Sequence, residues 1–583
     1  MEGAPKRKWG VTNPISEAPP SEADLKLNDE LIAYLKDKNN FETPEGMENR
    51  QKVLQLVQKV AEEFMRRVGR AKKLSEATVN SLGGKVFTFG SYQLGAYGPT
   101  SDIDTLILAP KHVMLDDFFE HWPSTFRELS NPDELTEMVV VPEAYVPIIK
   151  MEYRGVSLDV IFASLPTQAT IGRDFKLDDM NVLKGLNPDQ MRSVNGVRCG
   201  EELQQSVPQI KTFRHALRTI KMWANRRGVY GAVFGYPGGI AWAIMVARIC
   251  QLYPYACGAT VVSKFFNLMR KWRWPRPIML KESGGGGPLN LPYWNPSHDH
   301  KARAHMMPVI TPAVPQMCST HSVSLSTMAL MMDEFERADN IINSIVTGGK
   351  RWDDLFQRHT FFTKNHKYYL AVHATCTTKN AHDQFSGLVK SKVRLLAKGI
   401  DEGETNIKYA ITYMDGFDRY HRCGNEDQIS QVRQGQLKYK IDKDQIPKDD
   451  AQPSSDGWPK TIYTTTFYIG LILPEEDMKS DGKAKLDISW PVSDFRSLVE
   501  NHPDYDANTM GVRVVHIRDH QLPDDVFEEG ETRPTKPIKE KKKKANGTRI
   551  KHSNANGTTT ASTKAKRQFE ETGLEVRTSK RQK

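Results

Sequence analysis

Cysteine is scarce in this sequence and never forms the paired spacing typical of metal or redox motifs. The six cysteines of the 583 residues are scattered without a Cys-x-x-Cys pair. Such pairs are the usual signature of structural zinc sites, and regularly spaced cysteines are the usual signature of disulfide frameworks. We therefore expect neither, and we expect a reducing, intracellular setting.

Long apolar runs are missing as well. The longest one, residues 238–247, ends after ten residues at Arg248, whereas a helix needs about 20 apolar residues to span a bilayer. The N-terminal residues include Glu2, Lys6 and Lys8 and are followed by no apolar stretch, so no signal peptide is expected. The sequence predicts neither a membrane span nor a membrane partner.

An excess of positive charge is absent from most of the chain and is confined to its C-terminal end. Residues 531–583 hold 16 Lys and Arg against 5 Asp and Glu, and the whole chain has a formal net charge of +10. The preceding residues are thus close to neutral, so any polyanion they bind must meet a locally basic face. The segment 531–583 is predicted to be a disordered basic tail, with clusters that suit nuclear localisation or sequence-independent RNA contacts.

The periodicity of apolar residues divides the rest of the chain into three folded parts. With 39% hydrophobic and 26% charged residues, the composition is that of a globular protein, and at roughly 100 to 200 residues per domain the length allows three or four domains. After a mobile arm over residues 1–22, the pattern predicts a mixed α/β part, a helical part from about residue 207 and a small α/β sandwich after residue 357. The predicted helices cover residues 44–68, 213–220, 240–252, 261–269, 328–345 and 388–396. The predicted strands cover residues 86–89, 103–108, 145–153, 156–162, 368–374, 407–413, 462–473 and 512–517, with a long loop over 429–459.

The segment from Phe89 to Asp104 carries the chemistry. Gly90 and Ser91 follow a predicted strand, and such a turn lets backbone and hydroxyl groups approach phosphate oxygens. Asp102 and Asp104 are two residues apart, so on a strand they point to one face. An isolated Asp-x-Asp is more often a solvent-exposed strand edge, but the preceding Gly-Ser turn favours a functional site.

A third acid lies on another predicted strand. Asp159 alternates with Leu158, Val160 and Phe162, which leaves it on the face opposite to theirs. Carboxylates brought close together share a proton or bind a divalent cation, and their hard oxygen ligands suit magnesium. If this strand pairs with the Asp102/Asp104 strand, the three acids can hold two cations that act on a phosphoryl group.

These motifs resemble the nucleotidyltransferase superfamily related to DNA polymerase β. Longer segments closely resemble the eukaryotic, fungal-like nuclear poly(A) polymerases, over roughly residues 20–530. The segments that carry this resemblance are Phe89–Tyr92, Ser101–Asp104, Lys221–Tyr230, Gly238–Trp242, Arg248–Pro254, Met307–Pro312 and Gly387–Arg394.

The resemblance implies a division of the chain and a reaction. It implies a polymerase-β-like nucleotidyltransferase domain over residues 23–206, a helical middle domain over 207–356 and an RRM-like RNA-binding domain over 357–530. The reaction would be template-independent transfer of AMP from ATP to an RNA 3′ end, in mRNA polyadenylation. The implied setting is the nucleus, with pre-mRNA cleavage and polyadenylation factors as partners.

The same resemblance implies a set of site residues. Asp102, Asp104 and Asp159 would be the catalytic residues and would bind two Mg²⁺ ions, with Mn²⁺ as a substitute. The implied nucleotide contacts are Phe89, Gly90, Ser91, Asp102, Asp159, Lys221, Tyr230, Gly239 and Ile240. Lys221 and Tyr230 would contact the triphosphate, and Gly239 and Ile240 would line the adenine pocket. The family pattern has Asn where this chain has Ala232, so an adenine contact from that amide is missing or replaced.

Several of these residues have simpler interpretations when taken alone. A lysine on a helix is usually solvated, Tyr230 is typical of a core aromatic, and Gly239-Ile240 is typical of a packed helix start. Lys390, Lys392 and Arg394 share a predicted helix and suit either RNA phosphates or solvent. Two other functions remain open: a uridylyl- or CCA-adding transferase with the same triad, and a catalytically silent RNA-binding scaffold.

Overall fold

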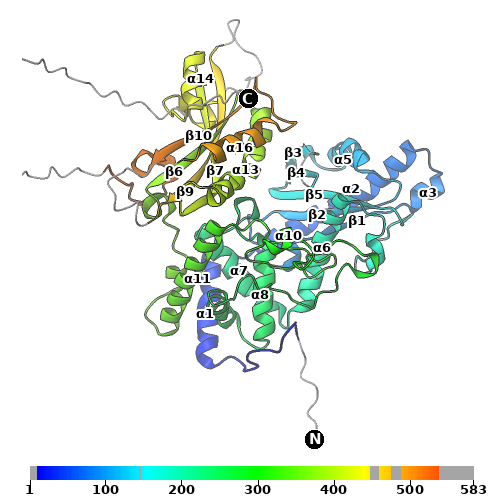
Figure 1. The fold of residues 1–583 in the computed structure, drawn as a ribbon. Helices are drawn as coiled ribbons and strands as arrows, with labels where there is room; N and C mark the ends of the chain where they lie inside the picture. The colour runs from blue at the N-terminus through cyan, green and yellow to red at the C-terminus, as the bar shows by residue number, and fades with distance from the viewer. Residues whose placement is uncertain (1–8, 143–145, 447–457, 475–486, 537–583) are drawn as a thin grey trace, which may run out of the picture.

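The computed structural model describes residues 9–142, 146–446, 458–474 and 487–536. A five-stranded sheet with helices, an all-helical unit and a second five-stranded sheet follow one another along the chain. In Figure 1 the first sheet lies to the right, the green helices lie below the centre and the second sheet lies at the upper left. The predicted α+β arrangement is confirmed. The disordered tail predicted over 531–583 is corrected for residues 531–536, because Glu531 accepts a hydrogen bond from Arg358 and Arg533 donates one to the carbonyl of Leu522. Its remainder, from residue 537, lies outside the described residues.

The first sheet places its two acidic strands side by side. Its strand order is β1-β2-β5-β4-β3, with β2 parallel to β5 and the other neighbours antiparallel. Asp104 on β2 lies directly opposite Asp159 on β5. The strands are β1 (Lys85–Thr88), β2 (Ile103–Pro110), β3 (Leu135–Val141), β4 (Ile148–Tyr153) and β5 (Val156–Leu165). The sequence patterns did not indicate β3, because its valines follow one another without alternation and Val139 and Val140 are exposed at the sheet edge.

Helices cover both faces of this sheet. Phe64 on α2 packs against Phe118 on α5, with ring centroids 6.3 Å apart, and both rings are buried against one face. Val194 and Val197 on α6 are buried against the other face. The helices of this part are α1 (Glu22–Asp37), α2 (Pro44–Ala71), α3 (Glu76–Ser81), α4 (Gly90–Leu94), α5 (Leu115–Leu129) and α6 (Pro188–Ser206).

The long helix α2 begins where its sequence signals predict. The side chain of Thr43 accepts a hydrogen bond from the backbone N–H of Gly46 at 3.0 Å, and Pro44 occupies the first helical position. This cap satisfies one of the donors that a helix start leaves free, and proline has no such donor to lose. The predicted start of this helix at residue 44 is confirmed.

The N-terminal helix α1 packs on the helical unit rather than on the first sheet. Tyr34 stacks on Phe356 with ring centroids 5.0 Å apart, and Asn28 Oδ1 accepts a hydrogen bond from the backbone N–H of Ala259. Before α1, the amide of Ile15 donates to the carbonyl of Leu252 at 2.8 Å. The prediction of a mobile arm over residues 1–22 is thus corrected for the described residues 9–22. They bind here because the last carbonyl of helix α8 (Gly239–Leu252) has no acceptor role within its own helix.

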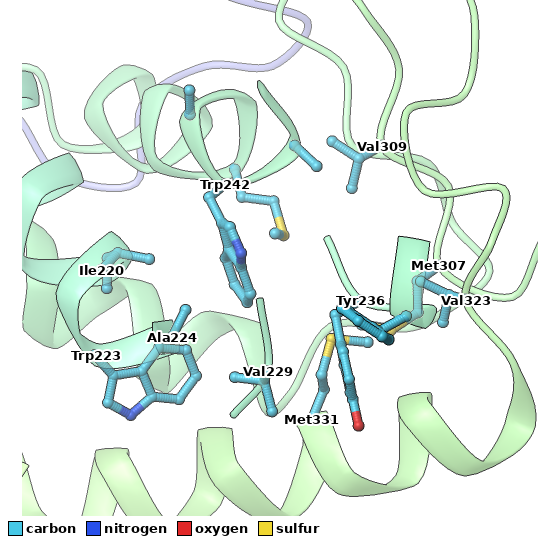
Figure 2. Packing of buried hydrophobic residues seen from close by; sticks show 14 of the residues in the cluster. Ile220, Trp223, Ala224, Val229, Tyr236, Trp242, Met307, Val309, Val323 and Met331 are labelled. Atoms are coloured by element: carbon cyan, nitrogen blue, oxygen red, sulfur yellow. The ribbon is translucent and has the colours of Figure 1, made fainter. Parts of the chain in front are cut away.

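The helical unit is built around aromatic rings. Trp223 contacts Trp242, Phe266 and Phe335, with ring centroids 4.7 to 5.8 Å apart. Figure 2 shows part of this cluster of buried side chains, with Trp223 and Trp242 on neighbouring helices. Large aromatic side chains bury about 150–250 Å² each, so these rings contribute much of the core. The helices are α7 (Ile210–Arg226), α8 (Gly239–Leu252), α9 (Gly258–Met269), α10 (His300–Arg303), α11 (Leu325–Val346) and α12 (Trp352–Leu355).

The C-terminal unit is an antiparallel sheet with helices on one face. Its strand order is β10-β6-β9-β7-β8, and α13 and α16 cover one face through residues such as Phe385, Val393 and Phe495. The strands are β6 (Tyr368–Cys376), β7 (Tyr409–Cys423), β8 (Lys440–Ile441), β9 (Lys460–Ile472) and β10 (Met510–Arg518). The helices are α13 (Lys379–Glu402), α14 (Glu426–Arg433) and α16 (Ser489–Glu500).

The other face of this second sheet is covered by the chain itself. Phe362, Leu522 and Val526 are buried against Tyr369 and Tyr468 of the sheet. In typical RRM domains, aromatic residues on the open sheet face stack on RNA bases. Here that region of the sheet is occupied by residues of the protein, so it does not offer the open aromatic face of a typical RRM.

Two predicted segments of the C-terminal unit are corrected. The long loop predicted over residues 429–459 contains helix α14, because Ile429 and Val432 are buried beside Cys423; residues 447–457 lie outside the described parts. The helix predicted over residues 388–396 extends in both directions, because Ala381 and Ile400 continue its buried stripe.

No described helix combines the length and the apolarity that crossing a bilayer requires. The six cysteines, all within the described residues, are free thiols.

Candidate active site

A turn between β1 and α4 carries the first predicted site residues. Phe89 precedes the short helix α4, and Gly90 has a φ of +63°, in the left-handed region that strains other residues. A Cβ atom at position 90 would also lie 2.0 Å from Oδ2 of Asp104. Glycine is therefore required both for the backbone conformation and for the close approach of the carboxylate.

Three carboxylates meet beside this turn. Asp104 and Asp159 are opposite each other on β2 and β5, and Asp102 immediately precedes β2. One oxygen atom from each of the three carboxylates lies within 4.8 Å of the others. The neighbours of Asp159 along β5, Leu158 and Val160, are buried on the opposite face against α2 and α5. The convergence of the three acids that the sequence predicts is present in the structure.

The triad is short of positive charge. Burial, together with the charges of Asp102 and Asp159, raises the pKa of Asp104 to about 7. Burial also raises the pKa of Asp159, although Lys150, with Nζ 3.4 Å from its Oδ2, opposes that shift. Carboxylates held this close share a proton or bind a cation, and their oxygen atoms are the ligands that hard divalent cations prefer. The residues therefore fit a divalent metal ion.

A cavity of about 550 Å³ lies beside the triad, within the range of about 300–1,000 Å³ typical of small-ligand pockets. Its walls come from the first sheet with α6 and from the helical unit. Nine predicted site residues line it: Phe89, Gly90, Ser91, Asp102, Asp104, Lys221, Tyr230, Gly239 and Ile240. Asp159 does not line the cavity and belongs to the site through the carboxylate triad.

Lys221 and Tyr230 supply polar groups to the helical wall. The amine of Lys221 lies 3.5 Å from the carbonyl oxygen of Ala96, and burial lowers its pKa, as does the nearby charge of Arg218. Burial raises the pKa of Tyr230 to about 12, so its hydroxyl stays protonated near neutral pH. A Cβ atom at Gly239 would lie 2.9 Å from that hydroxyl. Both side chains thus face the cavity rather than solvent or a closed core.

Other residues of the cavity escaped the sequence-based prediction. Helix α6 contributes one face, and a loop of the helical unit contributes Thr311, Pro315 and Met317. The α6 residues are Arg192, Asn195, Gly196, Cys199 and Gly200. Their i, i+3, i+4, i+7, i+8 spacing is a helical stripe, and the two glycines in it could have marked a close approach, since a Cβ at Gly196 would lie 3.2 Å from the ring of Phe89.

Ala232 lies near the cavity but is not among its lining residues. It begins a short 3₁₀ turn (Ala232–Phe234) that follows Tyr230 and Gly231. Its methyl group has no hydrogen-bonding capacity, so the adenine contact that the family pattern assigns to an amide at this position has no equivalent in this side chain.

Among the basic residues of α13, Lys390 lies beside the helical unit. Lys390, Lys392 and Arg394 are each half-buried, and the amine of Lys390 lies 5.5 Å from the ring centroid of Phe234. Burial lowers the pKa of Arg394. These side chains are thus less solvated than an ordinary charged helix face, and their contact with RNA phosphates stays a prediction.

Comparisons with known proteins agree on one family. Models of the poly(A) polymerase nucleotidyltransferase domain, the poly(A) polymerase central domain and the predicted poly(A) polymerase RNA-binding domain match residues 10–207, 212–358 and 360–536.

Full-length relatives cover nearly the same residues. Poly(A) polymerase pla1 of Schizosaccharomyces pombe is 42% identical over 91% of this chain and 95% of its own length. Poly(A) polymerase PAPa of Candida albicans is 41% identical over 92% of this chain and 96% of its own. A solved structure of the RNA terminal uridylyl transferase Cid1 aligns with 13% identity and a TM-score of 0.40, over 58% of this chain and 99% of that one.

Proposed function

This chain belongs to the eukaryotic, fungal-like poly(A) polymerase family, and from that premise we infer that it adds AMP from ATP to RNA 3′ ends without a template. The RNA 3′-oxygen forms a bond to the α-phosphorus of ATP, the bond between the α- and β-phosphates breaks, and pyrophosphate leaves. The observation that carries this assignment is the carboxylate triad beside a nucleotide-sized cavity, in a chain that matches its relatives over nearly their whole length.

We propose that the triad holds two magnesium ions, with manganese as a substitute. The oxygen atoms of the three carboxylates lie within 4.8 Å of one another, and the pKa of Asp104 is raised to about 7. Such a site becomes more stable when it binds a cation. Bound divalent ions would lower the pKa of the RNA 3′-hydroxyl and neutralise charge on the departing pyrophosphate.

The protein's own side chains hold and orient the substrates. We propose that Lys221 binds the triphosphate, because its amine is half-buried at the cavity wall and its weak contact with Ala96 leaves donors free for phosphate oxygens. Ser91 faces the same cavity next to the triad and can donate its hydroxyl to a phosphate. With acids on one wall and Lys221 on the other, both walls must be in place for catalysis.

Extension of a labelled, unstructured RNA oligonucleotide tests this function. The parent chain is incubated with the RNA, magnesium and one nucleoside triphosphate at a time. Only the reaction with ATP should give a ladder of extended products. Asp104→Asn removes one charge with little change in shape and should lower incorporation about 10³-fold or more, while its melting temperature stays equal or rises because a repelling charge is gone. A ladder with UTP or CTP instead would favour the uridylyl- or CCA-adding alternative. RNA binding with no ladder for any nucleotide would favour the scaffold.

We further propose a nuclear location and pre-mRNA cleavage and polyadenylation factors as partners. The support is the relatives' identity as poly(A) polymerases and the basic clusters of residues 537–583. A fluorescent fusion of the full chain that stays outside the nucleus would contradict the location, and failure to co-purify with the factors that cleave pre-mRNA would contradict the partners.

A further inference from the structure

Basic side chains hold the chain from the last residue of α4, Leu94, to Pro99, three residues before Asp102. We call residues 94–99 the carbonyl loop, because each of its six consecutive backbone carbonyls accepts a hydrogen bond from an arginine or a lysine. The acceptor and donor pairs are Leu94 with Arg214 (3.0 Å), Gly95 with Arg218 (3.1 Å), Ala96 with Lys221 (3.5 Å), Tyr97 with Arg218 (2.6 Å), Gly98 with Arg50 (3.3 Å) and Pro99 with Arg50 (2.9 Å).

Three of the four donors lie on one face of helix α7. Arg214, Arg218 and Lys221 follow the i, i+4, i+7 spacing of a helical stripe. Gly95 makes the approach possible: its φ is +71°, and a Cβ atom there would lie 2.4 Å from Nε of Arg214. A helix of the middle unit is thereby joined directly to the catalytic turn.

Arg218 is the centre of this arrangement. Its side chain is 7% exposed, and among the described residues no ion pair joins it to a carboxylate. It also donates to the carbonyl of Asn40, and its guanidinium lies 4.6 Å from the ring centroid of Phe41. Burial lowers the pKa of Arg218 to about 10, so it stays charged near neutral pH. A buried charge is costly unless polar groups surround it, and here backbone carbonyls do so.

The carbonyl loop connects the parts that must be placed together. Helix α4, which ends at the first residue of the carbonyl loop, carries Ser91, and Asp102 lies three residues after the loop's last residue, Pro99. Lys221, one of the donors, also lines the cavity. The loop contains two glycines, Gly95 and Gly98, and without its donors it would sample many conformations.

We propose that Arg218, assisted by Arg214, is a positioning residue for adenylyl transfer: by fixing the carbonyl loop on α7, it sets Asp102 and Ser91 against Lys221. The role rests on the proposed function, since it acts through residues of that site. A misplacement of about 1 Å can lower a rate about 10²-fold, so the arginine affects turnover although it touches neither substrate.

Replacement of Arg218 by methionine tests the proposal against a matched control. Arg248 on α8 is also a buried arginine, 3% exposed, with a pKa that burial lowers to about 10, and it donates to Gln251 and Thr12 away from the cavity. Arg218→Met and Arg248→Met should lower the melting temperature by similar amounts. Only Arg218→Met should lower kcat, about 10²-fold, and raise the Mg²⁺ concentration for half-maximal activity, with KM for RNA unchanged. Arg248→Met should keep kcat within about twofold.

The proposal is overturned if Arg218→Met loses stability like the control but keeps the parent's kcat and magnesium requirement. If Arg218→Met does not fold, Arg218→Lys and Arg214→Met decide. The lysine keeps the charge but cannot reach all three carbonyls, and Arg214→Met removes only the bond to Leu94. Each should lower kcat about tenfold, and parental kcat in both also overturns the proposal. ATP incorporation by the parent chain is measured first: its absence refutes the proposed function, whereas its presence together with parental kcat in the variants refutes only the role of Arg218.

Discussion

The two sheets of this chain bury carboxylates in opposite ways. On the first sheet, Asp104 lies among other acids, and burial raises its pKa to about 7. At the second, Asp525 in the segment that follows β10 accepts two hydrogen bonds from Arg419 of β7, at 2.7 and 2.8 Å, and one from Lys440 at 2.9 Å. Burial alone would raise the pKa of Asp525, but these partners lower it to about 2.

The difference separates a functional use of charge from a structural one. Asp525 and Arg419 tie the C-terminal segment around Leu522 and Val526 to the face of the second sheet. Among the described residues, the triad's one ion pair is between Lys150 and Asp159, at a longer distance of 3.4 Å, and the charge of Lys221 opposes the rise in the pKa of Asp104 only in part. Where buried charges are left uncompensated, a ligand can compensate them, and perturbed pKa values mark such places. The variants below disturb each sheet in turn.

The largest effect is expected from Gly90→Ala, on the side of the triad. The new Cβ atom would lie 2.0 Å from Oδ2 of Asp104, so the carboxylate must move. The residue would also hold a φ of +63°, which costs a non-glycine residue roughly 1–2 kcal/mol. We expect the rate of AMP incorporation at saturating ATP to fall about 10²-fold or more, together with a moderate loss of stability in thermal unfolding.

Gly155→Ala separates the two causes. Gly155 has a similar φ of +69°, but a Cβ atom there would meet nothing within 4 Å. The variant should therefore lose about as much stability as Gly90→Ala while keeping incorporation within about twofold of the parent. Equal losses of activity in both variants would show that backbone strain, and not displacement of Asp104, lowers the rate.

The local parts of this site could be predicted from the sequence, and the contacts between distant segments could not. Gly90, Asp102 and Asp104 lie within one turn and the start of one strand, and Asp159 is a single acid among apolar neighbours. The periodicity of apolar residues and the spacing of the motif are therefore enough to predict these four site residues. Helix α1 docks on residues over 200 positions away, and Arg218 reaches Gly95 across more than 100. The periodicity of apolar residues does not predict contacts between such distant segments. Nor does the sequence distinguish a buried arginine that donates to carbonyls from a solvated one.

On the side of the second sheet, Asp525→Asn should destabilise the protein without changing its chemistry. The change removes the charge that compensates Arg419, which is 2% exposed, and breaking a buried pair costs about 3 kcal/mol. Thermal or urea unfolding measures the loss. Because the folded pKa of Asp525 lies below its ordinary value of about 3.9, its contribution is complete above about pH 4 and disappears as pH falls toward 2. The stability of parent and variant should therefore converge on acidification.

Asp524→Asn is the control for that variant. Asp524 pairs with Arg533, but its side chain is 87% exposed, and exposed ion pairs contribute little. Its unfolding free energy should stay close to the parent's, and both variants should keep the parent's incorporation rate at saturating RNA. A large loss of that rate in Asp525→Asn would mean that the covered sheet face takes part in catalysis, and the contrast between the two sheets would fail.

The smallest effect is expected from deleting residues 537–583, whose excess of positive charge attracts RNA at long range. This segment holds 14 Lys and Arg against 4 Asp and Glu, so its removal should raise KM for RNA a few-fold at low salt and make that KM less dependent on salt. The deletion begins at 537 because Glu531 accepts a hydrogen bond from Arg358 at 2.6 Å, and a deletion from 531 would also loosen the covered sheet face. The incorporation rate at saturating RNA should not change, because the acids of the triad and the residues that line the cavity all lie before residue 320. A fall in the saturated rate, with parental stability, would instead place tail residues at the reacting end of the RNA.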